Sequence, residues 1–375
     1  MRSGKRQEKT CLQACQAQKE GSRKGEKEEI MKQRKTAGNP PDQPILHLAG
    51  GMRTDAAAKI ILRQQFEILQ AMEAGTMAGL DPECLHDFRV AVRRMRSALG
   101  QIRGIFPQRK LNRFRSGFAW LGEVTGPARD MDVYLLRYAD YADRLPLMAQ
   151  SDLEPLRTYL QNHQSREQAG VVKALKSHRY RQLLGAWEGF LDESVPVNTV
   201  LPNAMRPVLT VAGEQIARAY RRVIKQGQAI RRSSPPADLH QLRKSCKKLR
   251  YLLEFFQGFY PPKKIDRLIK ALKSLQDNLG LFQDLEVHGN ALRQFGNQMV
   301  EEQQVLPATL MAMGMLAADL QQQQRQVRKA FRETFAEFQR ARQRQLFEEL
   351  FPVRERLSRP SQSAEPVADS FPGQG

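Results

Sequence analysis

Apolar residues recur with a helical period along almost the whole stretch from residue 53 to residue 350. In residues 54–74, for example, Ile61, Phe66 and Leu69 are spaced as one side of an amphipathic helix requires. No stretch of useful length alternates apolar and polar residues, which is the pattern of a half-buried strand. The hydrophobic pattern therefore predicts an all-α fold.

Prolines and glycines divide this pattern into successive helices. We expect a helix that carries residues 86–96 to end before Pro107, and Asp130 to cap a helix after the break at Gly126-Pro127. In the second half we expect a helix to end at Pro261, the next to stop at Gly280, and another to begin at Asp284. The remaining predicted helices cover residues 54–74, 108–124, 131–145, 152–193, 204–226 and 307–351.

Two segments of the chain look alike. Residues 86–96 read HDFRVAVRRMR and residues 240–250 read HQLRKSCKKLR, and the second copy starts 154 residues after the first. Residues 121–133 (LGEVTGPARDMDV) match residues 275–287 (LQDNLGLFQDLEV) at the same offset of 154. One offset without a gap over about fifty residues indicates an internal duplication.

The duplication predicts a domain plan. We expect two pseudo-symmetric four-helix bundles, at residues 53–193 and 204–357, joined by a linker at 194–203. Residues 1–52 are polar and basic, and residues 358–375 are rich in Ser and Pro, so both tails are predicted to be disordered.

On a helix, each repeated motif places its cations on one face and its apolar residues on the other. We call these two cationic faces the ladders. Neighbouring cations on one helix face repel each other, so the ladders make most sense where an anion is bound. The alternative is a solvated face whose cations pair with acids on neighbouring helices. The ladder residues are His86, Arg89, Arg93 and Arg96 in the first copy and His240, Arg243, Lys247 and Arg250 in the second.

More basic residues could extend this surface. Arg94 and Lys248 lie about 80° round the helix from the ladders and are expected to point elsewhere. Residues on the following helices keep the offset of 154 or continue the stripe, and they are Lys110, Arg113, Lys264, Arg267, Lys270 and Lys273.

The charge balance indicates the class of partner. The chain has 375 residues, with 60 Lys and Arg against 40 Asp and Glu, which gives a net charge of +20. Such a surplus favours nucleic acid, an anionic membrane or a polyphosphate as partner. Residues 1–35 lack the apolar segment of a signal peptide, and no apolar run is long enough to span a bilayer, so we expect a soluble cytoplasmic protein.

Enzyme signatures are scarce. The acid-x-acid pairs Asp130/Asp132 and Asp284/Glu286 could hold Mg²⁺ near a phosphate, but they equally suit a helix cap or the positioning of a ladder arginine. No Gly-rich phosphate loop, His-Glu-x-x-His or Gly-x-Ser-x-Gly sequence is present. We therefore expect no catalytic residue, metal site or cofactor, and keep a metal-dependent phosphohydrolase as an alternative.

The two motifs together resemble the CHAD family, the conserved histidine α-helical domain. The resemblance rests on the motif at residues 86–96, on the Gly-x-x-Arg-Asp-x-Asp-Val segment at 126–133, and on their copies at the offset of 154. It covers about residues 53–350. The second copy departs from the first at Lys247 and Lys248, at Gln276 and at Gln283, which stand where the first has arginines, Gly122 and Arg129.

The resemblance implies that two helical bundles meet at a basic surface or pore that binds inorganic polyphosphate, and that the protein associates with polyphosphate granules. Other phosphate-rich polyanions would also fit. The Glu-x-Glu-x-Lys signature of the CYTH domain that often accompanies the family is absent, so the chain resembles a stand-alone member. The alternative of a nucleic-acid-binding protein is weakened because no aromatic residue is interleaved with the ladders to stack bases, and nucleic acid is expected only as a non-specific competitor.

Overall fold

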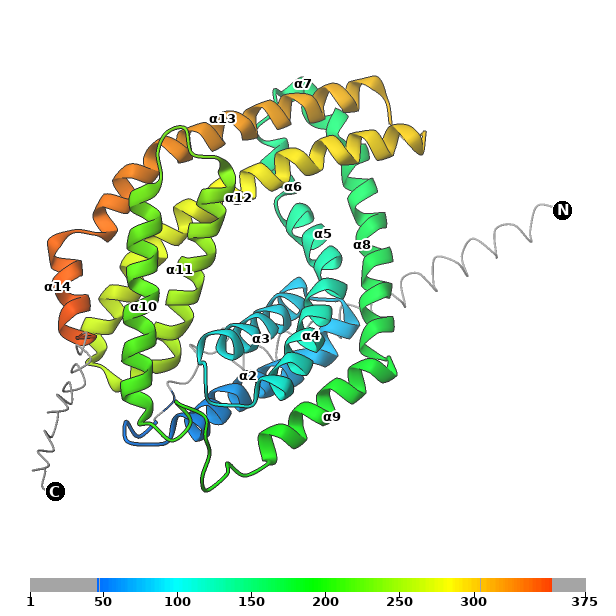
Figure 1. The fold of residues 1–375 in the computed structure, drawn as a ribbon. Helices are drawn as coiled ribbons and strands as arrows, with labels where there is room; N and C mark the ends of the chain where they lie inside the picture. Colours follow the sequence, from blue (N-terminus) through cyan, green and yellow to red (C-terminus); the bar gives the residue numbers. More distant parts are fainter. Residues whose placement is uncertain (1–45, 47, 304, 353–375) are drawn as a thin grey trace, which may run out of the picture.

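The computed structural model describes residues 46, 48–303 and 305–352, and the regular structure in this part of the chain is helical (Figure 1). The predicted all-α fold is confirmed. The first half of the chain contains α2 (Thr54–Ala78), α3 (Pro82–Gln101), α4 (Gln108–Val124), α5 (Gly126–Leu136), α6 (Tyr138–Ala142), α7 (Leu147–Gln150), the 3₁₀ turn η1 (Ser151–Leu153), α8 (Glu154–Leu175) and α9 (His178–Asp192).

The second half has the same order with fewer interruptions. It contains α10 (Val208–Ala229), α11 (Pro236–Phe256), the 3₁₀ turn η2 (Gln257–Phe259), α12 (Pro262–Glu301), α13 (Pro307–Phe338) and α14 (Ala341–Leu350). The first three long helices of the two halves start 154 residues apart, since α10, α11 and α12 begin at that offset from α2, α3 and α4.

A pair of short backbone segments marks the pseudo-two-fold relation between the halves. Arg53 and Pro207, which are 154 residues apart, form an antiparallel β-bridge. The flanking hydrogen bonds are reciprocal: the Thr54 amide donates to the Arg206 carbonyl at 3.0 Å, and the Val208 amide donates to the Met52 carbonyl at 2.8 Å. Only residues beside a two-fold axis meet their own equivalents. This arrangement supports the predicted duplication.

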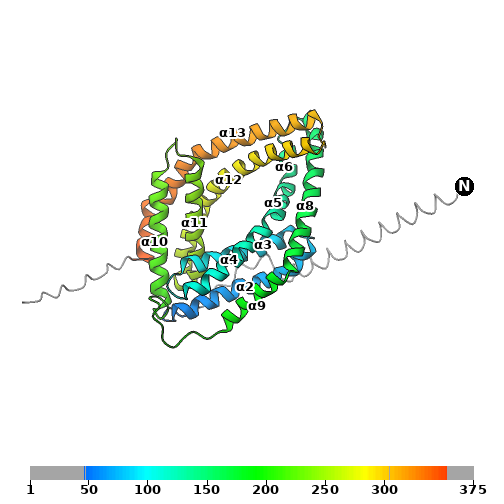
Figure 2. The same cartoon turned by 45° about the vertical axis from the view of Figure 1, so that its right-hand side comes forward.

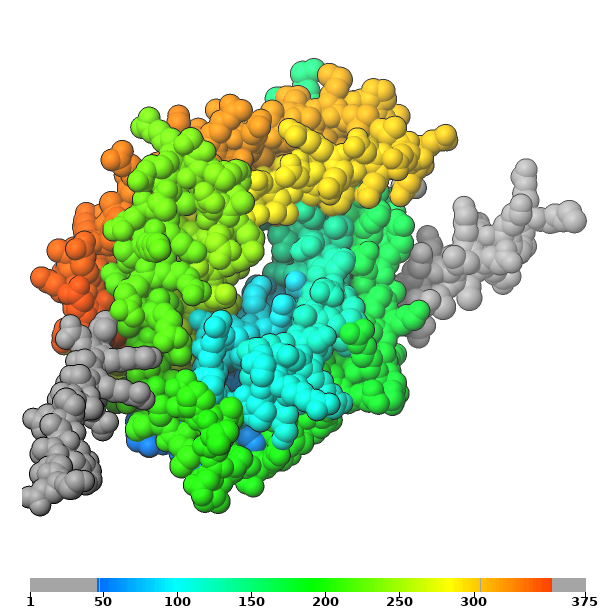
Figure 3. All heavy atoms as spheres, viewed as in Figure 1, coloured from blue at the N-terminus to red at the C-terminus, as the bar shows by residue number. Residues whose placement is uncertain are grey.

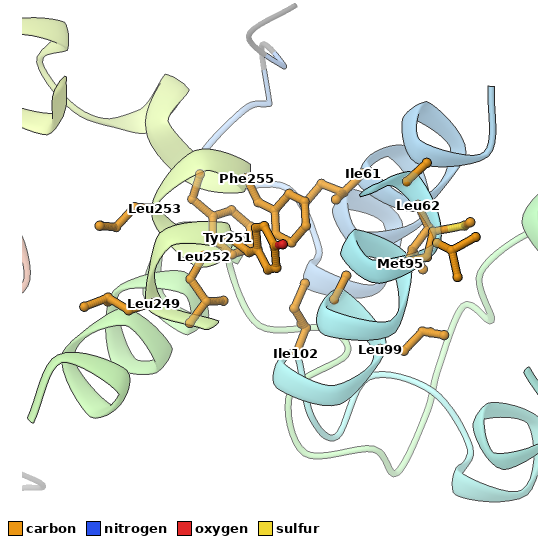
Figure 4. Close-up of a cluster of buried hydrophobic side chains, with 14 of the residues drawn as sticks. Ile61, Leu62, Met95, Leu99, Ile102, Leu249, Tyr251, Leu252, Leu253 and Phe255 are labelled. Carbon is orange, nitrogen blue, oxygen red and sulfur yellow. The ribbon is translucent and has the colours of Figure 1, made fainter. Parts of the chain in front are cut away.

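The two halves share one large core. This core includes Met95 and Leu99 of α3, Ile102 directly after it, and Leu252 and Phe255 of α11 (Figure 4). This core continues through α2, α4, α9, α10, α12 and α14. A second core, at the far end of the molecule, joins α5, α6 and α8 to the later part of α12 and the start of α13.

The helices enclose a central region, with α3, α5, α11 and α12 around it and the other long helices outside (Figures 1 and 2). In the space-filling view, the surface is hollowed where these four helices face each other (Figure 3). The predicted disordered tails fall almost wholly outside the described residues. Within the described part, no helix is both long and apolar enough to cross a bilayer.

Three predicted boundaries after the motifs are wrong, and one proline explains the difference between the halves. Asp130 does not cap a helix, because α5 already begins at Gly126. In the second half, α12 runs through Gly280 and Asp284 without a break. Pro127 has no N–H, so it cannot continue the backbone hydrogen bonds of α4. The residue 154 positions later is Leu281, whose N–H keeps the equivalent hydrogen bond in α12. Gly280 alone costs only about 1 kcal/mol in a helix, too little to end it.

Three long helices also end differently from the prediction. Helix α2 continues past Gly75 and ends at Gly79, whose φ of 63° forms a left-handed C-cap. The segment 152–193 is broken at Ser177, whose hydroxyl accepts the Tyr180 amide at 3.2 Å and so caps α9. The segment 307–351 is broken between α13 and α14. Serine is a preferred N-cap residue, so Ser177 could have indicated the start of α9 in the sequence. The prediction of one continuous helix relied on the spacing of apolar residues, which continues across this break.

Candidate functional site

Helices α3 and α11 carry the two ladders, and their sequences explain how they are placed. Each starts with a proline at its N-terminus, Pro82 and Pro236, where the missing N–H costs nothing. The Asp81 carboxylate also accepts the Glu83 amide at 2.9 Å, which caps α3. Their apolar faces are buried in the shared core, and this leaves the basic faces toward the central region. The buried residues opposite the ladders include Phe88, Met95, Leu99, Leu242, Leu249, Leu253 and Phe256.

The two ladders come close to each other at Arg93 and Lys247. Arg93 of α3 and Lys247 of α11 are equivalents at the offset of 154, and Arg93 lies close enough to act on the Lys247 ammonium. Burial, followed by Arg243, Arg93 and Arg250, lowers the pKa of Lys247 to about 7, and Asp284 opposes this only weakly. The structure thus brings the cations together in a way that periodicity alone could not show.

Arg89 and Arg243 are half-buried and anchor each ladder to the next helix. Arg89 Nη1 donates to the Gly122 carbonyl at 2.8 Å and to the Thr125 hydroxyl at 2.8 Å, which ties α3 to the α4–α5 joint. Arg243 Nη2 lies 3.6 Å from a carboxylate oxygen of Asp284. These two arginines hold the ladders in place as well as contributing charge to them.

Each of these arginines also packs against a glycine. A Cβ added at Gly126 would lie 3.7 Å from the guanidinium of Arg89, and one added at Gly280 would lie 3.8 Å from that of Arg243. Gly126 and Gly280 are themselves equivalents at the offset of 154. The same Arg–Gly contact therefore occurs in both halves.

The two ladder histidines occupy matching places with different neighbours. Burial, followed by the charge of Arg129, lowers the pKa of His86. In the second copy, Nδ1 of His240 forms a hydrogen bond with the side-chain oxygen of Gln283, the residue that replaces Arg129. Burial and the charge of Arg129 thus both favour the neutral imidazole of His86 in the free protein. A bound anion would favour its imidazolium form.

The first ladder contains the more exposed cations. Arg93 and Arg96 are exposed, and neither forms an ion pair within the described residues. Arg250 is half-buried and its Nε lies 3.3 Å from a carboxylate oxygen of Glu254. The ladder cations with the freest access to an anion are therefore Arg93 and Arg96, and Lys247 lies half-buried near Arg93.

Most of the predicted extension residues lie away from the ladders. Lys110 pairs with Glu193 at 2.9 Å, and Lys264 pairs with Glu349. Arg113 and Arg267 are exposed. Arg113 lies nine residues before Gly122 on α4, and Arg267 lies nine residues before Gln276 on α12. Nine residues correspond to about half a turn, so both arginines are on the opposite side of their helix from the face turned toward the ladders.

Of the other two extension residues, one lies on the helix face turned toward the second ladder. Lys273 is seven residues before Gly280 and therefore lies on the same face of α12, while Lys270 lies about 80° round the helix from that face. Both are exposed. Lys273 is thus the extension residue that best continues the second ladder.

An ion pair across the α3–α11 contact was missed by the sequence reasoning. Arg94 was expected only to point away from the ladders, but it is buried, donates to Glu254 at 2.5 Å and so shares that carboxylate with the ladder residue Arg250. Its guanidinium also lies over the rings of Tyr251 and Phe255, at 5.4 and 5.1 Å from their centroids. The position of Arg94 next to the apolar face of α3 was the feature of the sequence that could have indicated a buried ion pair.

The acid-x-acid pairs do not act together. Asp130 lies near Arg89, whereas the buried Asp132 accepts a hydrogen bond from Gln164 at 3.1 Å. Asp284 lies by Arg243. Within the described residues, no group of three or more His, Cys, Asp and Glu is placed to hold a metal ion. Of the two interpretations of these acids, the geometry favours the positioning of ladder arginines.

Residues 60–293 match the family model of the CHAD domain. A crystal structure of the CHAD domain from the plant Ricinus communis is 28% identical, with a TM-score of 0.64, over 78% of this chain and 94% of that one.

A second solved structure, PptA from Streptomyces chartreusis, is 20% identical, with a TM-score of 0.60, over 76% of this chain and 99% of that one, and it supports the fold alone. No curated protein matches. Because the family model covers more than half of its length, this chain belongs to the CHAD family.

Proposed function

We propose that this protein binds inorganic polyphosphate on the ladder surface where α3 and α11 face each other. The family is associated with polyphosphate binding, which supports this assignment. The observation that carries it is the meeting of Arg93 and Lys247. Cations that repel one another, with few acids among them, destabilise the empty protein. A bound polyanion neutralises them and removes this repulsion, which favours binding.

The chemistry of the ladders suits a linear phosphate chain. Arginine forks take phosphate oxygens in pairs, and a lysine acts as a point charge between them. The ladders run along two neighbouring helices, so successive phosphates could contact both. We propose binding without catalysis, because the carboxylates nearest the ladders, Asp284 and Glu254, lie against the guanidinium groups of Arg243 and Arg250. Association with polyphosphate granules would follow from such binding.

The test is an equilibrium titration of the full chain with long-chain polyphosphate at about 0.15 M salt, with duplex DNA as competitor. The main variant is Arg93→Glu/Lys247→Glu. The matched control is Arg113→Glu/Arg267→Glu, which makes the same change in charge at exposed residues off the ladders, again 154 residues apart.

We expect the ladder variant to lose at least about tenfold in affinity and the control to stay within about threefold of the parent protein. Excess DNA should fail to displace polyphosphate from the parent. Equal losses in the two variants would mean that the net charge, and not the ladders, attracts the polymer. Release of phosphate by the parent protein with Mg²⁺ or Mn²⁺ would overturn the non-catalytic part of the proposal.

A further inference from the structure

A second basic site lies on the outer side of the second half, where α10 and α14 run side by side (Figures 1 and 2). A groove of about 410 Å³ opens there. This volume falls in the range of about 300–1,000 Å³ typical of small-ligand sites. The lining residues are Tyr220, Arg221, Ile224, Lys225 and Gln228 of α10, Gln339 after α13, and Arg344 and Glu348 of α14.

The groove holds three exposed cations without ion pairs. Arg221, Lys225 and Arg344 form no ion pair with any described residue, although Glu348 also lines the groove one turn from Arg344. Three positive charges against one carboxylate leave a local surplus. This surplus favours an anionic ligand.

These cations are not inherited from the duplicated plan. At the offset of 154, Arg221 corresponds to Glu67 and Lys225 to Ala71. The ladders recur in both halves, whereas the basic groove occurs only in the second. The positive charge of the groove therefore does not follow from the repeat that produces the ladders.

The groove also offers an apolar side. Tyr220 and Ile224 lie one turn apart on α10 and are half-buried. The Tyr220 ring is stacked on Phe347, with centroids 3.8 Å apart and planes at 13°, so its position is fixed. Arg344 and Glu348 lie near its hydroxyl, and the side chains of Gln228 and Gln339 are linked at 3.4 Å.

We propose that this groove binds a nucleotide, with the phosphates on Arg221, Lys225 and Arg344 and the base against Tyr220 and Ile224. Amides such as those of Gln228 and Gln339 suit the polar edge of a base. Inorganic polyphosphate has no apolar part for the Tyr220 side of the groove, and the stacked bases of a duplex cannot enter it. A free nucleotide and a nucleotide within a single strand share the required chemistry.

The first experiment is a titration of the full-length Arg93→Glu/Lys247→Glu protein with ADP, adenosine, tripolyphosphate and a short single-stranded oligonucleotide at about 0.15 M salt. This background disables the ladders, so success or failure here is separate from the function proposed for them. The groove variant adds Arg221→Glu/Lys225→Glu. The matched control adds Arg218→Glu/Arg222→Glu, two exposed arginines of α10 that do not line the groove.

We expect ADP to bind, to bind more tightly than either adenosine or tripolyphosphate, and to lose at least about tenfold in affinity in the groove variant only. Tighter binding of the oligonucleotide than of ADP would identify a strand as the source of the nucleotide. Absent ADP binding, equal binding of tripolyphosphate, or an equal loss in the control would overturn the proposal.

A second measurement locates the ligand without relying on a charge reversal. Photolysis of the parent protein with 8-azidoadenosine triphosphate should label peptides from residues 218–229 or 339–348, and excess ADP should prevent the labelling. Labelling confined to the peptides of α3 and α11 would place the nucleotide on the ladders and overturn the groove site.

Discussion

Arg94 of α3 donates a 2.5 Å hydrogen bond to Glu254 of α11, and the same carboxylate lies 3.3 Å from Arg250. One acid thus neutralises a buried arginine at the contact between the two halves and a ladder arginine beside it. The equivalent of Glu254 in the first half is Gly100, so the pairing is not repeated. It follows that Glu254 stabilises the contact on which the alignment of the ladders depends.

Replacing Glu254 with Gln should lower the free energy of unfolding by about 1–3 kcal/mol, because Arg94 stays buried and loses its charged partner. Urea unfolding followed by helicity measures this. The control is Glu349→Gln, which breaks the exposed pair with Lys264 and should cost less than about 1 kcal/mol. Similar small losses in the two variants would show that the buried pair is weak.

The affinity for polyphosphate should fall as pH rises above 7. The pKa of Lys247 is about 7 in the free protein and should rise toward its usual value beside phosphate. At any pH between these two pKa values, binding of the polymer is therefore coupled to the uptake of a proton by Lys247. Below pH 7 the lysine is already charged and this dependence should end. The limiting slope for one proton is about tenfold in affinity per pH unit.

Titrations at pH 7, 8 and 9 and constant ionic strength measure this slope. Lys247→Arg should remove most of it, because arginine stays charged throughout. Lys248→Arg, at the exposed neighbouring position, should leave it unchanged. A parent protein with a flat profile over this range would show that Lys247 does not contact the polymer.

Arg89 and Arg93 should behave differently when changed to Lys. Arg89→Lys loses hydrogen bonds to Gly122 and Thr125 and should lower the free energy of unfolding by about 1–2 kcal/mol. Arg93→Lys should change it by no more than about 0.5 kcal/mol while weakening polyphosphate binding, since a lysine cannot offer a fork. Thermal unfolding beside a polyphosphate titration separates the two effects, and equal stability of the variants would refute the anchoring role of Arg89.

The second core should weaken in mild acid. His288 is buried there, in contact with Tyr141 and Tyr134, and burial followed by the charge of Arg137 lowers its pKa to about 4, with Asp284 opposing. Its unfolded pKa is about 6.5, so the unfolded chain binds the proton first as pH falls. Stability should therefore drop between pH 6.5 and about 4, by at most about 3 kcal/mol.

Urea unfolding of the parent and of His288→Phe at pH 7 and pH 5 tests this. The difference between the two pH values should shrink in the variant, because phenylalanine takes up no proton. Replacing the exposed His178 with Phe serves as the control and should leave the difference as in the parent. An unchanged difference in His288→Phe would assign the acid sensitivity to other groups.

Local patterns predicted the helices well where proline or the apolar period decided them. Helices α3, α11 and α12 begin at Pro82, Pro236 and Pro262, and α4 begins directly after Pro107. The predictions failed where a local signal was ambiguous. The predicted helix end at Gly280 and the predicted cap at Asp130 are wrong, because neither residue interrupts the backbone hydrogen bonds of the helix that contains it.

The sequence by itself determined the all-α class, the offset of 154 and the ladder faces, because helical period and repetition are properties of residue order. Only the tertiary structure decided which cations meet. Arg93 and Lys247 lie far apart in the chain and come together at a pseudo-two-fold axis, whereas Lys110 and Lys264 are drawn into ion pairs elsewhere. Charge and spacing name the candidates, but the packing of the two halves sets the distances between them, and electrostatic interactions depend on distance and burial.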